Sequence, residues 1–236
     1  MLRRIIIIGH KTIDCTAAIV SLIMFLICLY AMIDAYNVYE GANDTSLLKY
    51  KSEKGAVETL RELSADAVAW ITVDNTRIDY PVMQGKTNGE YLNKNPYGEF
   101  SLSGSIFLDS RNDKGFEDEY SMIYGHHMEH GAMFGSLDGY SDKDYFDSHK
   151  TGILSVINQK EYSISFFASC KAMANDDVIF DPSLYEDQAL FDYLQKKALV
   201  YYPQEVSAGS KIIALSTCQS AENNERMVVF GTLLQK

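Results

Sequence analysis

The amino-acid sequence predicts a mainly β protein: a closed or nearly closed β-barrel with a few helices, preceded by one membrane-spanning helix. Two observations lead to this prediction. One is a single long apolar run near the N-terminus. The other is a set of eight short runs, rich in β-branched and aromatic residues, which turn-forming residues separate and few helices interrupt. At 236 residues the chain has room for one good-sized domain and an appendage.

The apolar run carries no charge from Cys15 through Ile33, and these 19 residues match the roughly 20 that cross the hydrocarbon core of a bilayer. The apolar part of a secretory signal peptide is usually only about 7–15 residues long and precedes a small-residue cleavage site. Here polar residues follow instead, beginning at Asp34. We therefore expect an uncleaved membrane anchor over residues 12–36.

Basic residues flank this run on its N-terminal side, at Arg3, Arg4 and Lys11. Such a flank predicts a cytoplasmic N-terminus and an extracellular remainder, because positive charge is retained on the cytoplasmic side. The sequence therefore predicts a single-pass protein of the cell membrane with four regions. These are a basic cytoplasmic segment (1–11), the anchor (12–36), a polar stalk (37–54) and an extracellular domain (55–236).

The region beyond the first 40 residues is acidic, with 18 basic and 29 acidic residues and a net charge of −11. Such a surface repels the phosphate backbone, so nucleic acid is not expected as a partner. A cationic or amine-bearing partner is better tolerated.

The eight predicted strands of the outer domain read, in order, VAWITV, IDYPVMQ, GSIFLD, YSMIYGH, TGILSVI, EYSISFFASC, KIIALSTC and RMVVFGTLL. A helix precedes them, because Val57, Leu60 and Leu63 recur at helical spacing. A second helix is expected over residues 183–201, before the strand that ends in Cys218. Its predicted start is a capping box, with Ser183 as N-cap and Glu186 three residues later.

Two cysteines lie in the outer domain, Cys170 and Cys218. Counting alone leaves a disulfide between them open. The apolar alternation before Cys170 favours a small buried side chain. Cys218 would then be a lone thiol at the polar end of its strand, either an inert core residue or a nucleophile. As a nucleophile it needs neighbours that favour the thiolate, because a free thiol has a pKa of about 8.5.

Histidines cluster in the segment SMIYGHHMEHGAMFG, at His126, His127 and His130. Together with Cys218 they could form a zinc site, but adjacent residues of an extended segment point to opposite faces and no second ligand pair has the usual spacing. We therefore expect no metal. His126 ends a predicted strand and is the best placed to face the cysteine of a neighbouring strand.

Arg226 begins the last predicted strand, beside the strand of Cys218. An arginine at a strand end is ordinarily a solvated cation. A guanidinium next to a thiol, however, holds several donors in a fixed fork and can bind the oxyanion of an acyl transfer. Cys218, His126 and Arg226 together form a set for acyl transfer that needs no cofactor.

These motifs resemble those of the sortases, the cysteine transpeptidases of Gram-positive surfaces. The resemblance rests on LSTC followed eight residues later by Arg226, with YGHHM upstream, and it covers most of residues 57–234. The segments VAWITVDNTRIDYPVMQGKTNGEYL and GSIFLDSRN are similar to the class B branch. The resemblance implies the eight-stranded sortase-type barrel, with an N-terminal helix and a helix inserted before the cysteine strand.

The resemblance also implies site residues. Cys218 matches the nucleophile of the family, His126 its histidine and Arg226 its arginine. Three further positions match class B residues that contact the substrate: Ser216, Asn88 and Leu92. Core packing for Leu92 and a turn cap for Asn88 remain alternatives.

The implied function is cleavage of a Pro-x-Thr type sorting signal on secreted surface proteins, with transfer of the acyl group to an amine of a peptidoglycan precursor or cross-bridge. Three alternatives stay open at this point. The acceptor could be a lysine side chain, as in pilin polymerisation. The enzyme could hydrolyse rather than transfer. The domain could also be an inactive, anchored binding module.

Overall fold

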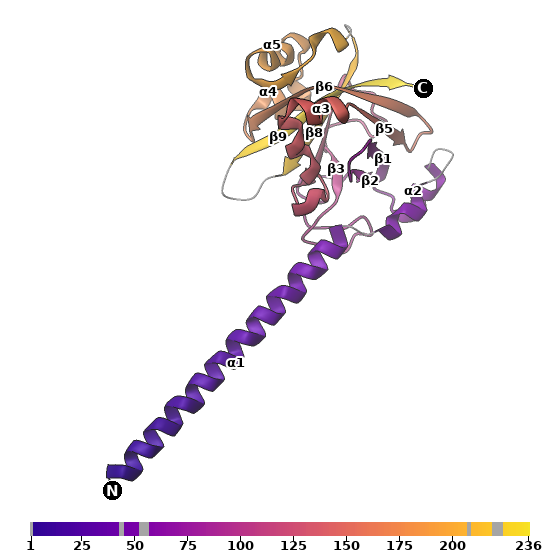
Figure 1. Ribbon diagram of the computed structural model, residues 1–236. Coiled ribbons are helices and arrows are strands. Elements are labelled where there is room, and N and C mark those ends of the chain that lie inside the picture. The colour runs from indigo at the N-terminus through magenta and orange to yellow at the C-terminus, as the bar shows by residue number, and fades with distance from the viewer. Residues whose placement is uncertain (1, 43–44, 52–56, 207–208, 219–223) are drawn as a thin grey trace. The chain divides into compact units, whose positions relative to one another are not determined.

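The computed structural model describes residues 2–42, 45–51, 57–206, 209–218 and 224–236 (Figure 1). Side chains are described in these ranges except at 2–9, 45, 57–59, 205 and 218. The chain forms two compact units, Met1–Glu40 and Gly41–Lys236. Each unit is built on a different physical principle, the first on a single apolar helix and the second on a closed sheet.

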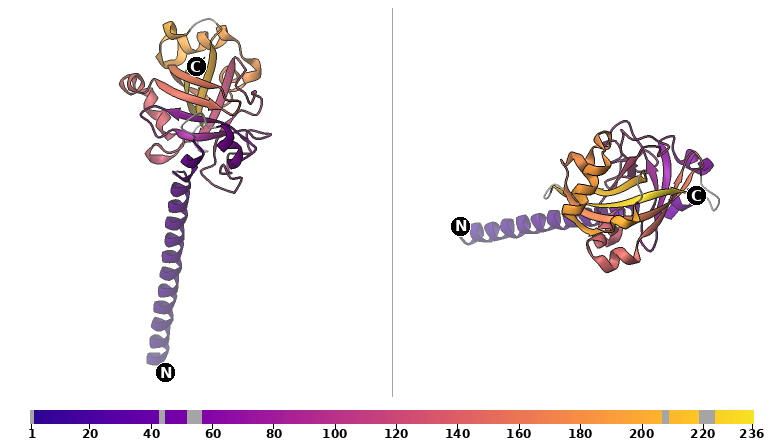
Figure 2. Two further views of the ribbon diagram at one scale, coloured as in Figure 1. Left: turned by 90° about the vertical axis from the view of Figure 1, so that its right-hand side faces the viewer. Right: turned by 90° about the horizontal axis from the view of Figure 1, so that it is seen from above.

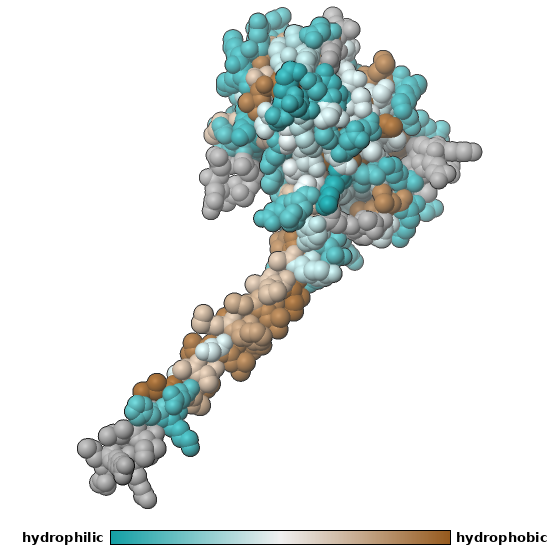
Figure 3. All heavy atoms as spheres, in the orientation of Figure 1, coloured by the Kyte–Doolittle hydropathy of each residue, from teal (hydrophilic) through white to brown (hydrophobic). Residues whose placement is uncertain are grey.

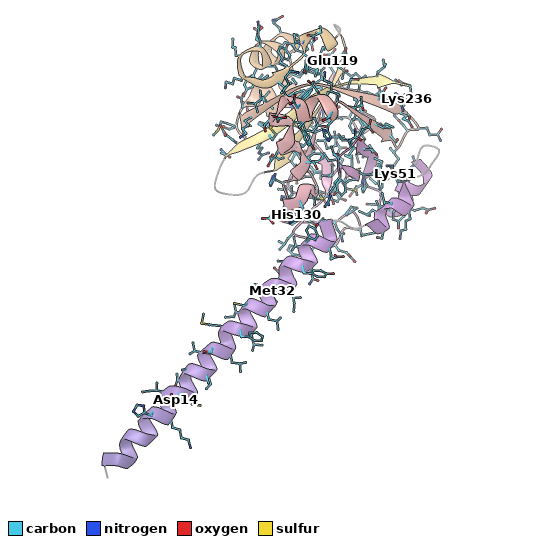
Figure 4. The ribbon with its side chains drawn as sticks, viewed as in Figure 1. Asp14, Met32, Lys51, Glu119, His130 and Lys236 are labelled. Carbon is cyan, nitrogen blue, oxygen red and sulfur yellow. The ribbon has the colours of Figure 1, made fainter. Side chains whose placement is uncertain are left out.

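Helix α1 (Leu2–Ala42) forms the first unit, except that its last two residues, Gly41 and Ala42, belong to the second. Its apolar residues form an almost continuous hydrophobic surface (Figure 3), and side chains such as Met32 project away from the helix axis (Figure 4). Among the described residues, α1 is the one helix long and apolar enough to cross a bilayer. At 1.5 Å per residue its 41 residues extend about 60 Å, twice the thickness of the hydrocarbon core.

The second unit contains a sheet in the order β5-β1-β2-β3-β4-β8-β9-β6-β7, which the pairing of β5 with β6 closes on itself. The cycle comprises β1 (Ala67–Val73), β2 (Asp79–Met83), β3 (Ile106–Leu108), β4 (Tyr120–His126), β5 (Thr151–Val156), β6 (Glu161–Met173), β8 (Lys211–Cys218) and β9 (Glu225–Gln235). These are the eight predicted strands, so the predicted eight-stranded barrel is confirmed. Figure 2 shows them curving around a common interior.

The barrel has a core on each face of its sheet. One core receives buried side chains from all eight strands and therefore fills the interior of the barrel, because only the interior is lined by every strand. Its members include Ile71, Val82, Ile106, Ile123, Leu154, Ile164, Leu215 and Val229. The other core covers part of the outside and includes Trp70, Tyr120, Ala214 and Phe230 together with Leu60, Leu190 and Leu194 of the helices. Because side chains alternate along a strand, every strand of the cycle except β5 contributes to both cores.

The described part of the chain contains five α-helices: α1, α2 (Val57–Leu63), α3 (Lys143–Ser148), α4 (Asp177–Phe180) and α5 (Asp187–Lys197). Short 3-10 turns lie at Thr45–Tyr50, Glu129–Gly131, Gly135–Ser141, Pro182–Leu184 and Pro203–Glu205. Helices α2 and α5 bury their apolar faces in the outer core. Both predicted helices of the outer domain therefore exist.

The second of these helices is shorter than predicted. Residues Ala198–Tyr201, which the prediction included in the helix, form strand β7 on the free edge of β6. The reason is local: Leu199, Val200 and Tyr201 suit a pleated surface better than a solvated helix end. The ninth strand lies outside the closed cycle and leaves the barrel count unchanged.

The predicted capping box is wrong. Ser183 lies inside the 3-10 turn Pro182–Leu184, where its backbone N–H donates to Oδ1 of Asp181 at 3.0 Å. Helix α5 begins only at Asp187, and its N-cap Glu186 makes no capping hydrogen bond with its side chain. The proline after Asp181 explains the difference, because it starts a separate turn five residues before the first residue of the helix.

Candidate active site

The predicted catalytic residues lie where β4, β8 and β9 run side by side. His126 is the last residue of β4 and pairs with Cys218, the last residue of β8, in a parallel register. Strand β9 runs antiparallel to β8, and Ser216 pairs with Val228. Continued by two residues, this register brings Arg226 level with Cys218. Three residues far apart in the sequence thus meet at one end of three adjacent strands.

Strand alternation puts the three positions on the same face of the sheet. In β8, Ile213 and Leu215 belong to the interior core, whereas Ile212 and Ala214 belong to the outer core. Position 218 has the parity of the outer-core residues. His126 shares the parity of Tyr124 in β4, and Arg226 that of Val228 and Phe230 in β9, all three of which are outer-core residues. The site is therefore on the outside of the barrel.

A cavity of about 490 Å³ lies at this place. It is lined by His126 and Arg226 and by Asn88, Gly89, Leu92, Phe107, Arg111, Tyr124, Ala174 and Phe180. Half of these residues are apolar or aromatic, and the polar groups among the rest can fix the orientation of a ligand. The side chain of Cys218 lies outside the described part of the chain, so its place is given by its backbone register alone.

The imidazole of His126 is half-buried and oriented by the main chain. Its Nε2 lies 2.7 Å from the carbonyl oxygen of Leu92. Because a carbonyl oxygen only accepts, Nε2 must carry the proton of this hydrogen bond. In a neutral ring the unprotonated nitrogen is then Nδ1. The Leu92 contact therefore leaves Nδ1 as the ring nitrogen that can exchange a proton with a substrate.

The guanidinium of Arg226 rests on an aromatic ring. Its Cζ lies 5.3 Å from the ring centroid of Phe180, which is the last residue of α4 and is buried. A cation over a ring face gains about 0.5–2 kcal/mol, more as water is excluded. Phe180 thus supports the one arginine that the sequence placed beside the cysteine strand.

A buried carboxylate holds three of the residues that line the cavity, Asn88, Arg111 and Tyr124. Asp109, which directly follows β3, is fully buried and accepts five hydrogen bonds. Arg111 supplies three of them, from its backbone N–H and from Nε and Nη2 of its guanidinium, and Asn88 and the hydroxyl of Tyr124 supply the others. A buried charge is tolerable when it is matched in this way.

These contacts set the charge state of the wall. Burial by itself would raise the pKa of Asp109, but hydrogen bonds from Arg111 and Asn88 outweigh it, so the pKa lies below the usual carboxyl value. For Tyr124, burial and the neighbouring Asp109 raise the pKa far above its usual range. At neutral pH the lining therefore carries the guanidinium of Arg111 and the neutral phenol of Tyr124, and both are held by the buried carboxylate of Asp109 behind them.

The three predicted substrate-binding residues differ in their surroundings. Leu92 and Asn88 line the cavity, but both ends of the Asn88 amide are engaged: Nδ2 donates to Asp109 and Oδ1 accepts from the backbone N–H of Ser110. Ser216 is fully buried, donates to the carbonyl of Thr217 at 3.2 Å and is absent from the lining of the cavity.

The histidines do not gather around one point. His127 pairs with Asp138 at 2.7 Å, whereas His126 faces Leu92. Among the described side chains, no three of His, Cys, Asp or Glu converge as metal ligands. Cys170 is a buried free thiol in β6.

Sequence reasoning missed four residues that shape the cavity: Asp109, Arg111, Tyr124 and Phe180. A signal for the first two was present, since an acidic and a basic residue two positions apart directly follow a short apolar strand. Phe180 carried no such signal, because it lies in a four-residue helix that has no period to detect.

The arrangement suits acyl transfer. A nucleophile position, a histidine with one exchangeable nitrogen and a supported guanidinium surround a cavity large enough for several residues of an extended peptide. The chemistry needs a carbonyl carbon to be attacked, a leaving amine to be protonated and negative charge to be held.

Comparison with known proteins agrees with this chemistry. A family model described as a sortase domain matches residues 71–234. Sortase B of Listeria monocytogenes is 36% identical over 209 residues, which cover 86% of this chain and 83% of that protein. A class B sortase of Streptococcus pyogenes involved in pilus biogenesis has a TM-score of 0.69 at 37% identity, over 75% of this chain and 97% of that one. The Staphylococcus aureus sortase B-substrate complex has a TM-score of 0.70 at 28% identity, over 84% and 93%.

Proposed function

We propose, since this chain belongs to the sortase family and to its class B, that it is anchored in the membrane and joins secreted proteins to a surface amine. Its substrates would carry a Pro-x-Thr type sorting signal. The observation that carries the proposal is the meeting of His126, Arg226 and the register position of Cys218 around one cavity.

In the first half-reaction the thiolate of Cys218 attacks the carbonyl carbon of the threonine. Arg226 holds the negative charge that develops on the carbonyl oxygen, or the substrate backbone next to it. His126 starts this step as the imidazolium paired with the thiolate, with protons on both Nε2 and Nδ1. The bond between carbonyl carbon and nitrogen then breaks, and the departing amine takes the proton from Nδ1, which leaves a neutral ring. A thioester on Cys218 remains.

In the second half-reaction a primary amine attacks the thioester carbon and gives up a proton to Nδ1 of His126. The bond between carbon and sulfur breaks, which restores the thiolate and completes a new amide. The Leu92 carbonyl supports both steps, because it keeps Nε2 protonated while Nδ1 cycles.

Leu92 is proposed to contact the sorting peptide through its side chain, and Asn88 to shape the same wall through its bonds to Asp109 and Ser110. Ser216 would act without touching the substrate, because its hydroxyl donates to the carbonyl of Thr217 and so holds the backbone next to the nucleophile. The apolar helix α1, with its basic N-terminal side, would hold the enzyme in the membrane with its barrel outside. Substrates held in the same membrane then meet the enzyme at raised effective concentration.

The test uses the full chain in detergent micelles, incubated with a small library of Pro-x-Thr peptides and analysed by intact-mass spectrometry. We expect an acyl adduct that maps to Cys218, its release by an added amine, and its loss in Cys218→Ala. The matched control is Cys170→Ala, which should keep the adduct. An adduct that survives Cys218→Ala would end the assignment of the nucleophile. Failure of every peptide, with Cys218 no more reactive than Cys170, would favour an inactive binding domain.

A lysine acceptor is the second candidate, because the similar S. pyogenes structure is a class B sortase involved in pilus biogenesis. The acidic charge of the domain, −11 beyond residue 40, also tolerates a lysine-rich partner. Competition between a peptidoglycan-type amine and a lysine-containing peptide, read as the ratio of the two ligation products, separates the candidates. Free acid as the sole product, at saturating amine, would indicate hydrolysis instead.

A further inference from the structure

The contacts of Arg111 reach both walls of the cavity. On one side Nε and Nη2 donate to the two oxygens of Asp109, at 2.9 and 2.8 Å. On the other side Nη2 donates to the carbonyl oxygen of Phe180 at 2.6 Å, and Nη1 lies 2.9 Å from Oδ1 of Asp181. A single guanidinium therefore joins the segment after β3 to the end of α4.

The attachment at Asp109 is firm. Apart from Arg111, its carboxylate is held by Asn88 and Tyr124. The amide of Gln84 binds the carbonyl oxygens of Asp109 and Asn112, each at 2.8 Å. This part of the chain is buried and its polar groups are matched, so it can act as a fixed support.

The attachment at Phe180 is the one that matters for the chemistry. The carbonyl of Phe180 lies at the end of a four-residue helix, where no further turn supplies a partner. Arg111 supplies it. The ring of the same residue carries the guanidinium of Arg226. A shift of the Phe180 backbone would therefore move the surface on which Arg226 rests.

We propose that Arg111 is a positioning residue for Arg226 and acts through Phe180. This inference rests on the proposed function, in which Arg226 stabilises charge during acyl transfer. The long arginine side chain gains from support at its guanidinium, because a displacement of about 1 Å at a catalytic group can cost on the order of 100-fold in rate. A lysine at position 111 would be a poor substitute, since its single ammonium lacks the fork that binds Asp109 and Phe180 together.

The first measurement does not depend on activity. The full chain in detergent micelles is labelled with ¹⁵N-arginine, and the Nε–Hε signal of Arg226 is assigned by its loss in Arg226→Lys. We expect the Phe180 ring to shift this signal upfield. The shift should disappear in Phe180→Leu and collapse in Arg111→Ala. The control Arg77→Ala removes an exposed guanidinium from the β1–β2 turn and should leave the signal unchanged. An unchanged signal in Arg111→Ala would overturn the proposal.

The second measurement is the steady-state rate of amide formation with an added amine, over a range of peptide concentrations, which gives kcat and KM. We expect Arg111→Ala and Phe180→Leu each to lower kcat about 10- to 100-fold with KM changed less than about 3-fold. The double variant should be no slower than the slower single variant, because both changes break the same connection. Multiplied losses, or a loss explained by a smaller folded fraction in circular dichroism, would instead indicate a general structural role and refute the proposal. A parent chain that forms no adduct refutes the proposed function, and the arginine signal alone then decides whether Arg111 positions Arg226.

Discussion

Substitution of Gly125 tests how tightly β4 is packed against the interior core next to His126. The residue has interior parity, and a Cβ added to it would lie 2.3 Å from Cδ1 of Ile106 and 2.8 Å from Cγ of Phe134. Both neighbours are fully buried members of the interior core. Ordinary contacts between carbon atoms begin at about 3.5 Å, so Ile106 would have to retreat by more than 1 Å in a core without free space.

Overpacking of this kind typically costs about 1–3 kcal/mol. Two overlaps against buried side chains put Gly125→Ala at the upper end, and we expect a loss of about 2–3 kcal/mol in the free energy of unfolding. For a domain of 150–250 residues each kcal/mol corresponds to about 2–4 °C. The midpoint of thermal unfolding should therefore fall by about 4–12 °C.

The assay is near-UV circular dichroism of the full chain in detergent, heated in parallel with two further variants. Ile106→Val removes Cδ1, the atom that lies closest, at an expected cost of about 0.5–1.5 kcal/mol on its own. The double variant should be more stable than Gly125→Ala alone by about 1 kcal/mol, because the new methyl group occupies the vacated space. The control Gly89→Ala, whose nearest neighbour would lie 3.9 Å away, should change little. Strict additivity of the two substitutions would refute the reasoning.

Three further predictions concern charge and reactivity. Asp109→Asn should lower the free energy of unfolding by about 1.5–3 kcal/mol at neutral pH. Because the pKa of Asp109 in the folded chain lies below its usual value, the stability difference between parent and variant should shrink as the pH falls below about 4. An equal stability difference in urea titrations at pH 7 and pH 3 would contradict this. Burial raises the pKa of the Cys170 thiol to about 12, so iodoacetamide at pH 8 should leave Cys170 unmodified until the chain unfolds, as peptide mapping would reveal. Arg226→Lys should lower turnover at least about 10-fold with an unchanged melting curve, because a point charge lacks the fork; near-normal turnover would make Arg226 a structural residue.

The strands, and the positions of Cys218 and Arg226 at the ends of two of them, could be predicted from the sequence because both depend on local patterns. Alternation in β8 and β9 marks two strands, and a cysteine and an arginine at their ends follow directly. Strand β7 was missed because its four residues continue the apolar face of a helix, and its identity is decided by the free edge of β6. That edge is a tertiary feature which no short window contains.

The wall of the cavity was missed for a related reason. Arg111 is joined to Phe180 across 69 positions of the sequence, and Tyr124 to Asp109 across 15. Asp109, Arg111 and Phe180 carry no periodic signal, since they follow a short strand or lie in a four-residue helix, and the alternation of Tyr124 in β4 does not reveal its partner. The chemistry of Asn88 was likewise unpredictable: the sequence shows an amide near the site, but only the fold shows that Asp109 and Ser110 already occupy it.

The alternation that builds the two cores also builds the site, so the stability of the barrel protects its chemistry. A slip of β8 by one residue would turn Ile213 and Leu215 toward the helix-covered outside and put the smaller Ala214 and Ser216 into the interior. Overpacking on one face and cavities on the other would each cost several kcal/mol. The same slip would turn position 218 away from His126. Apolar packing therefore fixes which strand positions meet. The imidazole of His126 is then oriented by the Leu92 carbonyl, and the guanidinium of Arg226 by the Phe180 ring. It follows that substitutions in the interior core should lower stability and activity together, whereas Phe180→Leu, which keeps an apolar side chain in the outer core, should lower activity more than stability.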